Sequence, residues 1–96
     1  GMNKYEAMFI IKPDLSEEES KVLFNHIHEL ITKNNGGILQ SNIWAEKRKL
    51  FFPIKKYREG TYYLLNFTLN PDAIVKIRNA CGLNENILRM LILALG

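Results

Sequence analysis

The sequence has 96 residues, which is enough for one domain with one hydrophobic core but not for two. Apolar residues make up 47% of the chain and charged residues 24%, a balance typical of globular proteins that argues against disorder in most of it. The net charge is only +3, but six of the thirteen basic residues fall between positions 47 and 58. The single cysteine, Cys81, excludes an intramolecular disulfide and a cysteine-based metal cluster. It lies in a helical pattern, so we expect a small buried hydrophobic residue there.

The start of the chain and its hydropathy indicate a cytoplasmic protein. Gly1 in front of Met2 is typical of a residue left by tag removal, so we treat residues 1–96 as a single domain with Met2 as its natural start. The residues after Met2 lack the basic start and apolar run of a signal peptide. The longest apolar stretch, 90–95, is far shorter than the roughly 20 residues that cross a membrane. We therefore expect a cytoplasmic location and no membrane partner.

The first predicted strand covers residues 5–11, where side chains alternate between two faces. One face would carry Tyr5, Ala7, Phe9 and Ile11. Pro13 ends the strand because proline cannot donate to a sheet ladder.

The next segment predicts a helix. Ser16 is a typical N-cap, and Glu19 can complete a capping box. The glutamates at 17–19 also suit the positive end of the helix dipole. An apolar stripe follows at helical spacing: Leu23, Ile27, Leu30 and Ile31. The Asn-Asn-Gly-Gly sequence at 34–37 ends the helix with residues that tolerate positive φ.

Two further strands follow. Residues 38–54 predict a long second strand, and Pro53 requires that its end lies at a sheet edge or a bulge. Residues 55–60 are predicted to form a polar turn, and residues 62–69 a third strand. On that strand Phe67 should face the core.

A second helix and a fourth strand complete the chain. Asn70 is a typical cap with Pro71 in the first helical position, and Gly82 ends the helix. Residues 88–95 predict the last strand. The order β-α-β-β-α-β is that of the ferredoxin-like split βαβ sandwich, an α+β fold in which two helices cover one face of a four-stranded antiparallel sheet. Phe67 should then pack in the core with Phe9, Ile27 and Ile77.

Several short motifs, in their order and spacing, resemble the bacterial small-subunit ribosomal protein number six family. Lys4-Tyr5-Glu6 and Pro13-Asp14-Leu15-Ser16 are similar to the beginning of that family. The segment Lys-Arg-Lys-Leu-Phe-Phe-Pro-Ile-Lys-Lys at 47–56 is similar to its basic-Leu-Ala-Tyr-Pro-Ile signature. Asn86-Ile87-Leu88-Arg89 is similar to the residues that lead into its fourth strand. The resemblance extends over essentially the whole chain.

The resemblance implies a structural protein of the small ribosomal subunit, not an enzyme, located in the cytoplasm. It implies binding to the central domain of small-subunit ribosomal RNA as a pair with small-subunit ribosomal protein eighteen, with no cofactor and no small-molecule substrate. The candidate RNA-binding residues are basic: Lys4, Lys47, Arg48, Lys49, Lys55, Lys56, Arg58 and Arg89. The candidate contacts with the protein partner lie on or beside the sheet face that the helices leave uncovered: Met8, Ile10, Trp44, Tyr62 and Leu64. No catalytic or metal-binding residue is predicted.

The second strand departs from the family pattern near Trp44. Relatives usually carry Trp or Leu and then Gly, five residues before the signature leucine. Here Trp44 precedes Leu50 by six residues, and Ala45-Glu46 stand where the glycine is expected. The extra residue would require a β-bulge. The chain also has Ala94-Leu95-Gly96 where relatives usually carry a basic residue, which lowers the basic surface.

The residues alone leave alternatives open. Lysines on an edge strand also prevent pairing between sheets, and charges on a turn can serve solubility alone. An uncovered face with aromatics could stack RNA bases, but the aromatic signature of RNA recognition motifs is absent, and an apolar face more often contacts protein. His26 and His28 point to different sides of a helix and do not form a metal pair.

Two other functions are compatible with the fold. One is a ferredoxin-like regulatory or ligand-binding module that acts as a homodimer. The other is an enzyme such as a small acyl phosphatase or mutase, which would need an arginine beside an amide or a histidine at a loop. Neither Arg48 nor Arg58 has such a neighbour in the sequence.

Overall fold

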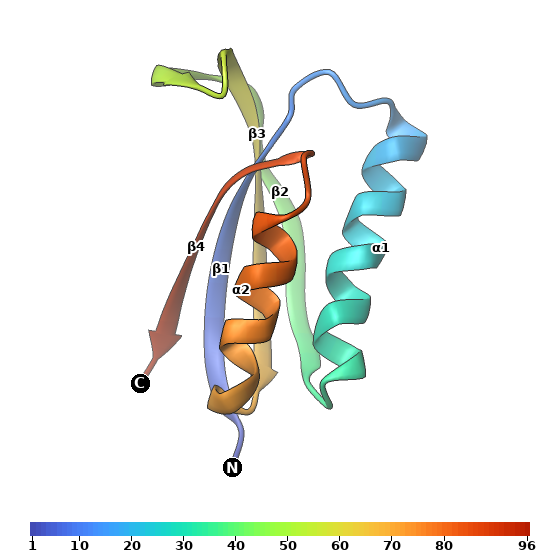
Figure 1. The fold of residues 1–96 in the computed structure, drawn as a ribbon, viewed down its shortest axis with the longest axis vertical. Helices are drawn as coiled ribbons and strands as arrows, with labels where there is room; N and C mark the ends of the chain where they lie inside the picture. Colours follow the sequence, from blue (N-terminus) through green and yellow to red (C-terminus); the bar gives the residue numbers. More distant parts are fainter.

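The computed structural model describes every residue from Gly1 to Gly96. The elements follow in chain order: β1 (Asn3–Ile11), α1 (Glu17–Lys33), β2 (Gly37–Ile54), β3 (Tyr57–Leu69), a 3-10 turn η1 (Pro71–Ala73), α2 (Ile74–Gly82) and β4 (Ile87–Leu95). The strands pair antiparallel in the order β2-β3-β1-β4, and both helices cover one face of the sheet (Figure 1). The predicted ferredoxin-like fold is confirmed, and β2 lies at a sheet edge as Pro53 requires. No helix is long and apolar enough to cross a membrane.

The core lies between the covered face of the sheet and the helices. The antiparallel register of β1 and β3 places Tyr5 opposite Phe67, so the buried sets of both strands fall on the same face. Phe67 is 1% exposed and belongs to one buried cluster with Phe9, Ile27 and Ile77, as predicted. Burying these large side chains supplies most of the driving force for folding.

The N-terminus of α1 carries the predicted capping box. The Glu19 backbone N–H donates to Ser16 Oγ at 3.1 Å, and the Ser16 N–H donates to Glu19 Oε1 at 2.8 Å. Two backbone donors that a helix start leaves unpaired are thereby satisfied. The hydrogen bonds from Ser16 lower the pKa of the Glu19 carboxyl.

The C-terminus of α1 uses Asn35 for the left-handed position. Asn35 has a φ of 64°, and the Gly36 N–H reaches back to the Ile31 carbonyl at 2.9 Å. Gly36 itself has no positive φ. It is required for space, because a Cβ there would lie 2.4 Å from the Thr68 carbonyl oxygen.

The second helix begins one turn later than the sequence suggests. The Asn70 side chain accepts from the Asp72 N–H at 3.0 Å, but the first turn is 3-10, and α2 starts at Ile74. The helix ends at Gly82, as predicted. Cys81 is buried in the core, which confirms the expected small buried hydrophobic residue, and this burial raises the pKa of its thiol to about 11.

The β2–β3 hairpin extends beyond the other strands (Figure 1). Ile54 pairs with Tyr57, so the connection is only Lys55-Lys56, with φ values of 49° and 75°. The predicted polar turn over 55–60 is therefore wrong, because β3 already begins at Tyr57. Positive φ at both central residues belongs to type I′ turns, where Asn-Gly is the usual sequence, and a Lys-Lys pair does not signal it.

The predicted bulge in β2 is present. Ala45 lies opposite Tyr62 and Arg48 opposite Gly60, so β2 has one residue more than β3 in this interval. Lys47 takes up the difference with a φ of 46°.

Candidate nucleic-acid and protein interfaces

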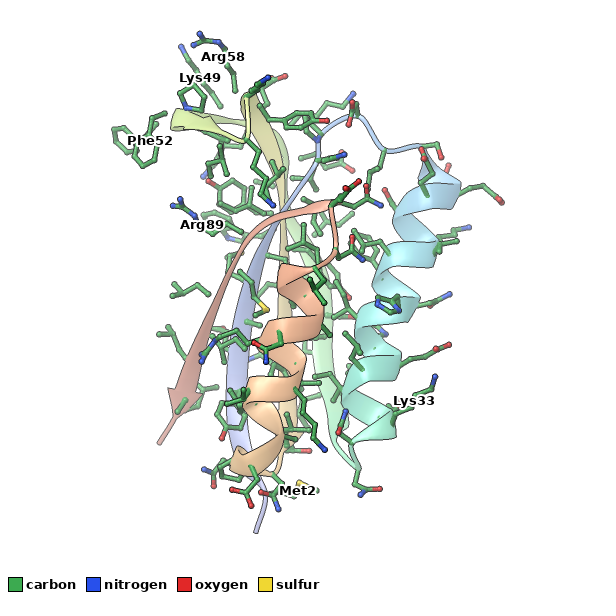
Figure 2. The ribbon with its side chains drawn as sticks, in the orientation of Figure 1. Met2, Lys33, Lys49, Phe52, Arg58 and Arg89 are labelled. Carbon is green, nitrogen blue, oxygen red and sulfur yellow. The ribbon has the colours of Figure 1, made fainter.

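The basic residues of the hairpin gather where β2 and β3 project past β1 and β4. Lys49 and Arg58 extend from this end, away from the body of the sheet (Figure 2). Six exposed cations belong to the hairpin: Lys47, Arg48, Lys49, Lys55, Lys56 and Arg58. The only ion pair within 4.0 Å is Lys33–Glu29 on α1, so no hairpin cation has a direct carboxylate partner. The hairpin is therefore a region of positive potential.

The other two predicted basic residues lie at opposite ends of the sheet. Arg89 is opposite Ile10 near the start of β4, and it lines one hollow together with Lys55 of the hairpin turn. Lys4 is opposite Leu95 at the far end of the same strand pair. The structure therefore brings Arg89 to the basic hairpin but not Lys4.

The uncovered face of the sheet brings all five predicted partner residues together. Met8 is opposite Leu64 and Ile10 is opposite Tyr62 on the central strands. Trp44 of β2 meets the Tyr62 ring edge-on, with ring centroids 5.7 Å apart. These side chains form one continuous apolar surface.

The fourth strand enlarges this surface. Leu91 lies opposite Met8 and Leu93 opposite Glu6, and these leucines are 59% and 51% exposed. Neither was predicted as a contact. The alternation of Leu91, Leu93 and Leu95 in the sequence is the signal that could have identified them. We call the uncovered surface formed by Met8, Ile10, Trp44, Tyr62, Leu64, Leu91 and Leu93 the apolar face.

Trp44 connects the apolar face to the basic hairpin. The Arg48 guanidinium carbon lies 4.9 Å from the centre of the Trp44 ring, a cation–π arrangement. A molecule on the apolar face would therefore adjoin a molecule bound by the hairpin.

Two exposed phenylalanines near the turn were also not predicted as contacts. Phe51 is fully exposed and Phe52 is 61% exposed, and Phe52 projects from the hairpin near Lys49 (Figure 2). Aromatic rings among cations are suited to stacking on unpaired bases. Alternation cannot find them, because they lie between Lys49 and Ile54, where the pairing of β2 with β3 is irregular.

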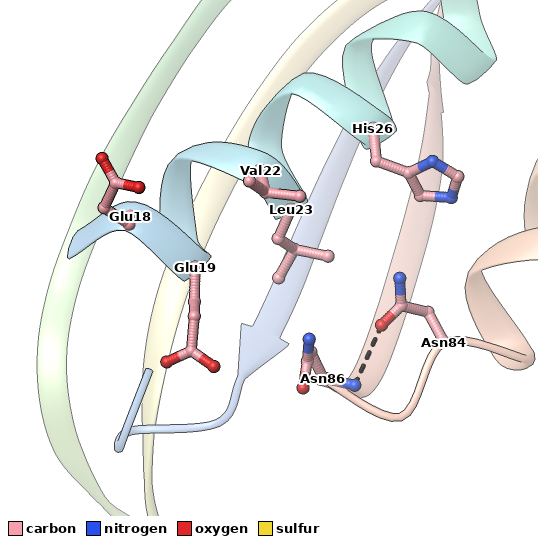
Figure 3. Close-up of a pocket in the computed structure, with 7 residues that line it drawn as sticks. All are labelled: Glu18, Glu19, Val22, Leu23, His26, Asn84 and Asn86. Carbon is pink, nitrogen blue, oxygen red and sulfur yellow. Dashed lines mark hydrogen bonds between the residues drawn. The ribbon is translucent and has the colours of Figure 1, made fainter. Parts of the chain in front are cut away.

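A hollow of about 500 Å³ lies on the other side of the molecule, between α1 and the loop before β4 (Figure 3). Its polar groups already serve local structure. Glu19 belongs to the capping box, and the Asn84 side chain accepts from the Asn86 N–H at 2.9 Å. His26 and Glu18 are exposed at its border. The arrangement is explained by helix capping and loop structure.

The chain is similar to known small-subunit ribosomal proteins over nearly its whole length. A model of the family described as ribosomal protein S6 matches residues 4–94. Small ribosomal subunit protein bS6 of Caldanaerobacter subterraneus is 39% identical over 96% of each chain. The protein of the same name from Helicobacter acinonychis is 37% identical over 96% of this chain, which spans 64% of that relative's length.

Solved structures agree with the sequence comparison. The crystal structure of 30S ribosomal protein S6 from Thermotoga maritima has a TM-score of 0.88 and 27% identity, over 99% of this chain and 89% of that one. An uncharacterized protein from Thermotoga maritima has a TM-score of 0.63 at 12% identity, which shows the fold alone.

Proposed function

Since the chain belongs to the ribosomal protein S6 family, we propose that it binds the central domain of small-subunit ribosomal RNA together with small-subunit ribosomal protein eighteen. The family consists of structural, non-enzymatic proteins of the small ribosomal subunit. The chain is accordingly not an enzyme, and its place is the ribosome in the cytoplasm.

The contact between Arg48 and Trp44 carries the proposal. It joins a surface suited to RNA and a surface suited to protein at one point, 4.9 Å from guanidinium to ring centre. Two molecules that bind these surfaces lie side by side and can contact each other. This arrangement supports joint binding of an RNA and a protein.

The hairpin is the proposed RNA contact because it presents cations without carboxylate partners. Phosphate contacts supply much of the affinity for RNA, and each contact releases counterions. Arg48, Lys49 and Arg58 extend from an edge strand and its neighbour, where an RNA backbone has free access. Lys4, at the other end of the sheet, would contact a separate part of the RNA.

The apolar face is the proposed protein contact. Large exposed apolar patches on soluble proteins usually mark protein interfaces. Its centre, Met8 and Leu64, contains no charged side chain, which is typical of an interface core. A second copy of the chain on the same face is the competing arrangement.

A filter-binding titration of a central-domain RNA fragment tests the proposal. It compares the chain alone, protein eighteen alone and both together, at three salt concentrations. In one variant Lys47, Lys49 and Arg58 become Gln; a control variant of equal charge changes three exposed lysines of the helices, Lys21, Lys33 and Lys76. We expect the hairpin variant to reduce the salt slope by roughly 0.7–0.9 per lost phosphate contact, and the control to leave it unchanged.

A third variant, Trp44→Ser with Leu91→Ser, tests the protein half. It should retain the weak RNA binding of the chain alone and lose the gain that protein eighteen provides. Equal slopes for the hairpin and control variants would contradict the RNA half of the proposal. An undiminished gain in the third variant would contradict the protein half.

A further inference from the structure

A second hollow, of about 160 Å³, lies between the hairpin turn, α2 and the start of β4. Three cations from three elements line it: Lys55 of the turn, Arg78 of α2 and Arg89 of β4. No carboxylate lines it. The other lining residues are mostly apolar: Cys81, Gly82, Ile87, Leu88 and Met90. Figure 2 shows Arg89 below the projecting hairpin end, on the side where Phe52 extends.

A bulge in β4 builds the floor of this hollow. Arg89 is opposite Ile10 and Ile87 is opposite Ile11, so Leu88 is one residue too many for β1. As a result Ile87 and Leu88 are both buried, and Arg89 is exposed beside them. Bulges re-aim side chains in this way.

The turn and the helix complete the hollow. The left-handed backbone at Lys55, with a φ of 49°, places a lysine in the turn position where Asn is usual. Arg78 is exposed on α2, and Gly82 four residues later adds no side chain that would fill the space. A Cβ at Gly82 would meet no atom within 4 Å, so the hollow is open there.

The charge of the hollow favours an anion. None of its three cations lies within 4.0 Å of a carboxylate, so only the negative C-terminal end of α2 offsets their mutual repulsion. Ile87 and Leu88 form a buried apolar floor, whereas the three cations are exposed and accessible to a ligand from solvent. An anion in the hollow would be adjacent to basic side chains from three different elements.

The hollow lacks the backbone N–H groups that usually bind a small free phosphate, which favours a phosphate within a longer chain. Small free phosphates are commonly bound by backbone N–H groups at helix N-termini or glycine-rich loops. Here α2 presents its C-terminal end, at Gly82, and supplies no such N–H groups. We propose that the hollow receives a backbone phosphate of the RNA strand held by the hairpin, with Lys55, Arg78 and Arg89 as its contacts. The inference rests on the proposed function and adds Arg78, which extends the RNA surface from the sheet edge to the helical layer.

Two charge-matched substitutions on α2 test the inference. Arg78→Gln and Lys76→Gln remove the same charge from the same helix, but only Arg78 lines the hollow. In filter binding of the central-domain fragment with protein eighteen present, Arg78→Gln should lower the salt slope by roughly 0.7–0.9 and weaken binding at low salt. Lys76→Gln should bind as the wild type does.

A second pair of substitutions changes the charge at the hollow and leaves all three cations in place. Gly82→Glu places a carboxylate at the border of the hollow, whereas Gly82→Ala adds only a methyl group in open space. We expect the Glu variant to weaken RNA binding and the Ala variant to leave it unchanged, with urea melts of both proteins to verify that each is folded under the binding conditions.

The outcomes separate this inference from the proposed function. No RNA binding by the wild type would overturn both. Wild-type RNA binding with identical salt slopes for Arg78→Gln and Lys76→Gln would overturn the phosphate hollow alone. NMR titrations followed at the Gly82 amide distinguish a free phosphate from an RNA phosphate. A saturable shift with sodium phosphate and none with the RNA fragment would identify the hollow as a small-anion site and contradict the proposal.

Discussion

The Arg48 guanidinium lies over the Trp44 ring, 4.9 Å from its centre, and the same ring also meets Tyr62 of β3 edge-on. Trp44 is the only tryptophan in the chain, and it is 53% exposed. Its fluorescence therefore reports directly on the junction between the basic hairpin and the apolar face.

Docking of protein eighteen should bury the Trp44 indole. We expect its emission to shift to shorter wavelength and its quenching by acrylamide to fall, because the ring leaves water. Unchanged quenching with saturating protein eighteen would place the partner elsewhere.

The cation–π pair itself should matter little for folding. Arg48→Ala should cost only about 0.5–1 kcal/mol of stability, the usual value of an exposed cation–π pair.

Phe67 should be among the most costly residues to truncate. Its side chain is 1% exposed and stacks with Tyr5 at a ring-centroid distance of 5.6 Å. Phe67→Ala should lower the free energy of unfolding by about 3–5 kcal/mol, the range for a buried phenylalanine. Its neighbour Asn66 is on the other face, so Asn66→Ala should cost less than about 1 kcal/mol. Urea melts decide it, and a larger loss for Asn66→Ala would mean that the strand faces are reversed.

Replacing Lys55-Lys56 by Asn-Gly should make the hairpin turn more stable but weaken RNA binding. Lys55 and Lys56 both have positive φ, which costs roughly 1–2 kcal/mol for a residue with a Cβ. Changing them to Asn-Gly should raise the free energy of unfolding by about 1 kcal/mol, because Asn-Gly suits a type I′ turn. The same variant should bind the RNA fragment more weakly at low salt. Lower stability in urea would contradict the assigned turn geometry.

The capping box should make stability depend on acid pH. Hydrogen bonds from Ser16 lower the pKa of Glu19 in the folded protein, so the ionised carboxylate stabilises the fold. This stabilisation is fully present above the ordinary glutamate pKa and is lost as the pH falls through the lowered pKa of the folded state. Urea melts at about pH 7 and about pH 2 should show a smaller acid loss for Glu19→Gln than for the wild type. Ser16→Ala should cost about 1 kcal/mol at neutral pH, and Ser16→Asp much less, since Asp also caps helices. Equal acid losses for wild type and Glu19→Gln would contradict the hydrogen bonds of the box.

Much of the fold could be predicted because local and global preferences agree. The alternation around Phe9 and Phe67 defines the buried face of the central strands, and Ser16 with Glu19 marks the start of α1. The bulge beside Lys47 could be anticipated from one surplus residue. Each of these features depends on residues that are close in the sequence or on a strict period.

The rest depends on tertiary packing. The turn at Lys55 adopts positive φ without glycine because the flanking strands pair up to Ile54 and Tyr57, and no local signal shows this. The distance of Lys4 from the hairpin turn follows from the antiparallel pairing of β1 with β3, which places Lys4 opposite Thr68. Arg78 joins Arg89 only because α2 packs beside the start of β4.

The central claim is that two adjoining surfaces bind two different molecules, and a methyl and amide NMR titration tests it most directly. Addition of protein eighteen should shift the methyl groups of Met8, Ile10 and Leu64 and leave those of the buried Ile27 and Ile31 in place. Subsequent addition of the RNA fragment should shift the amides of Lys49 and Arg58. Shifts of the Met8 and Leu64 methyls that depend on the concentration of the chain alone, with no response to protein eighteen, would contradict the account and indicate a second copy on the apolar face.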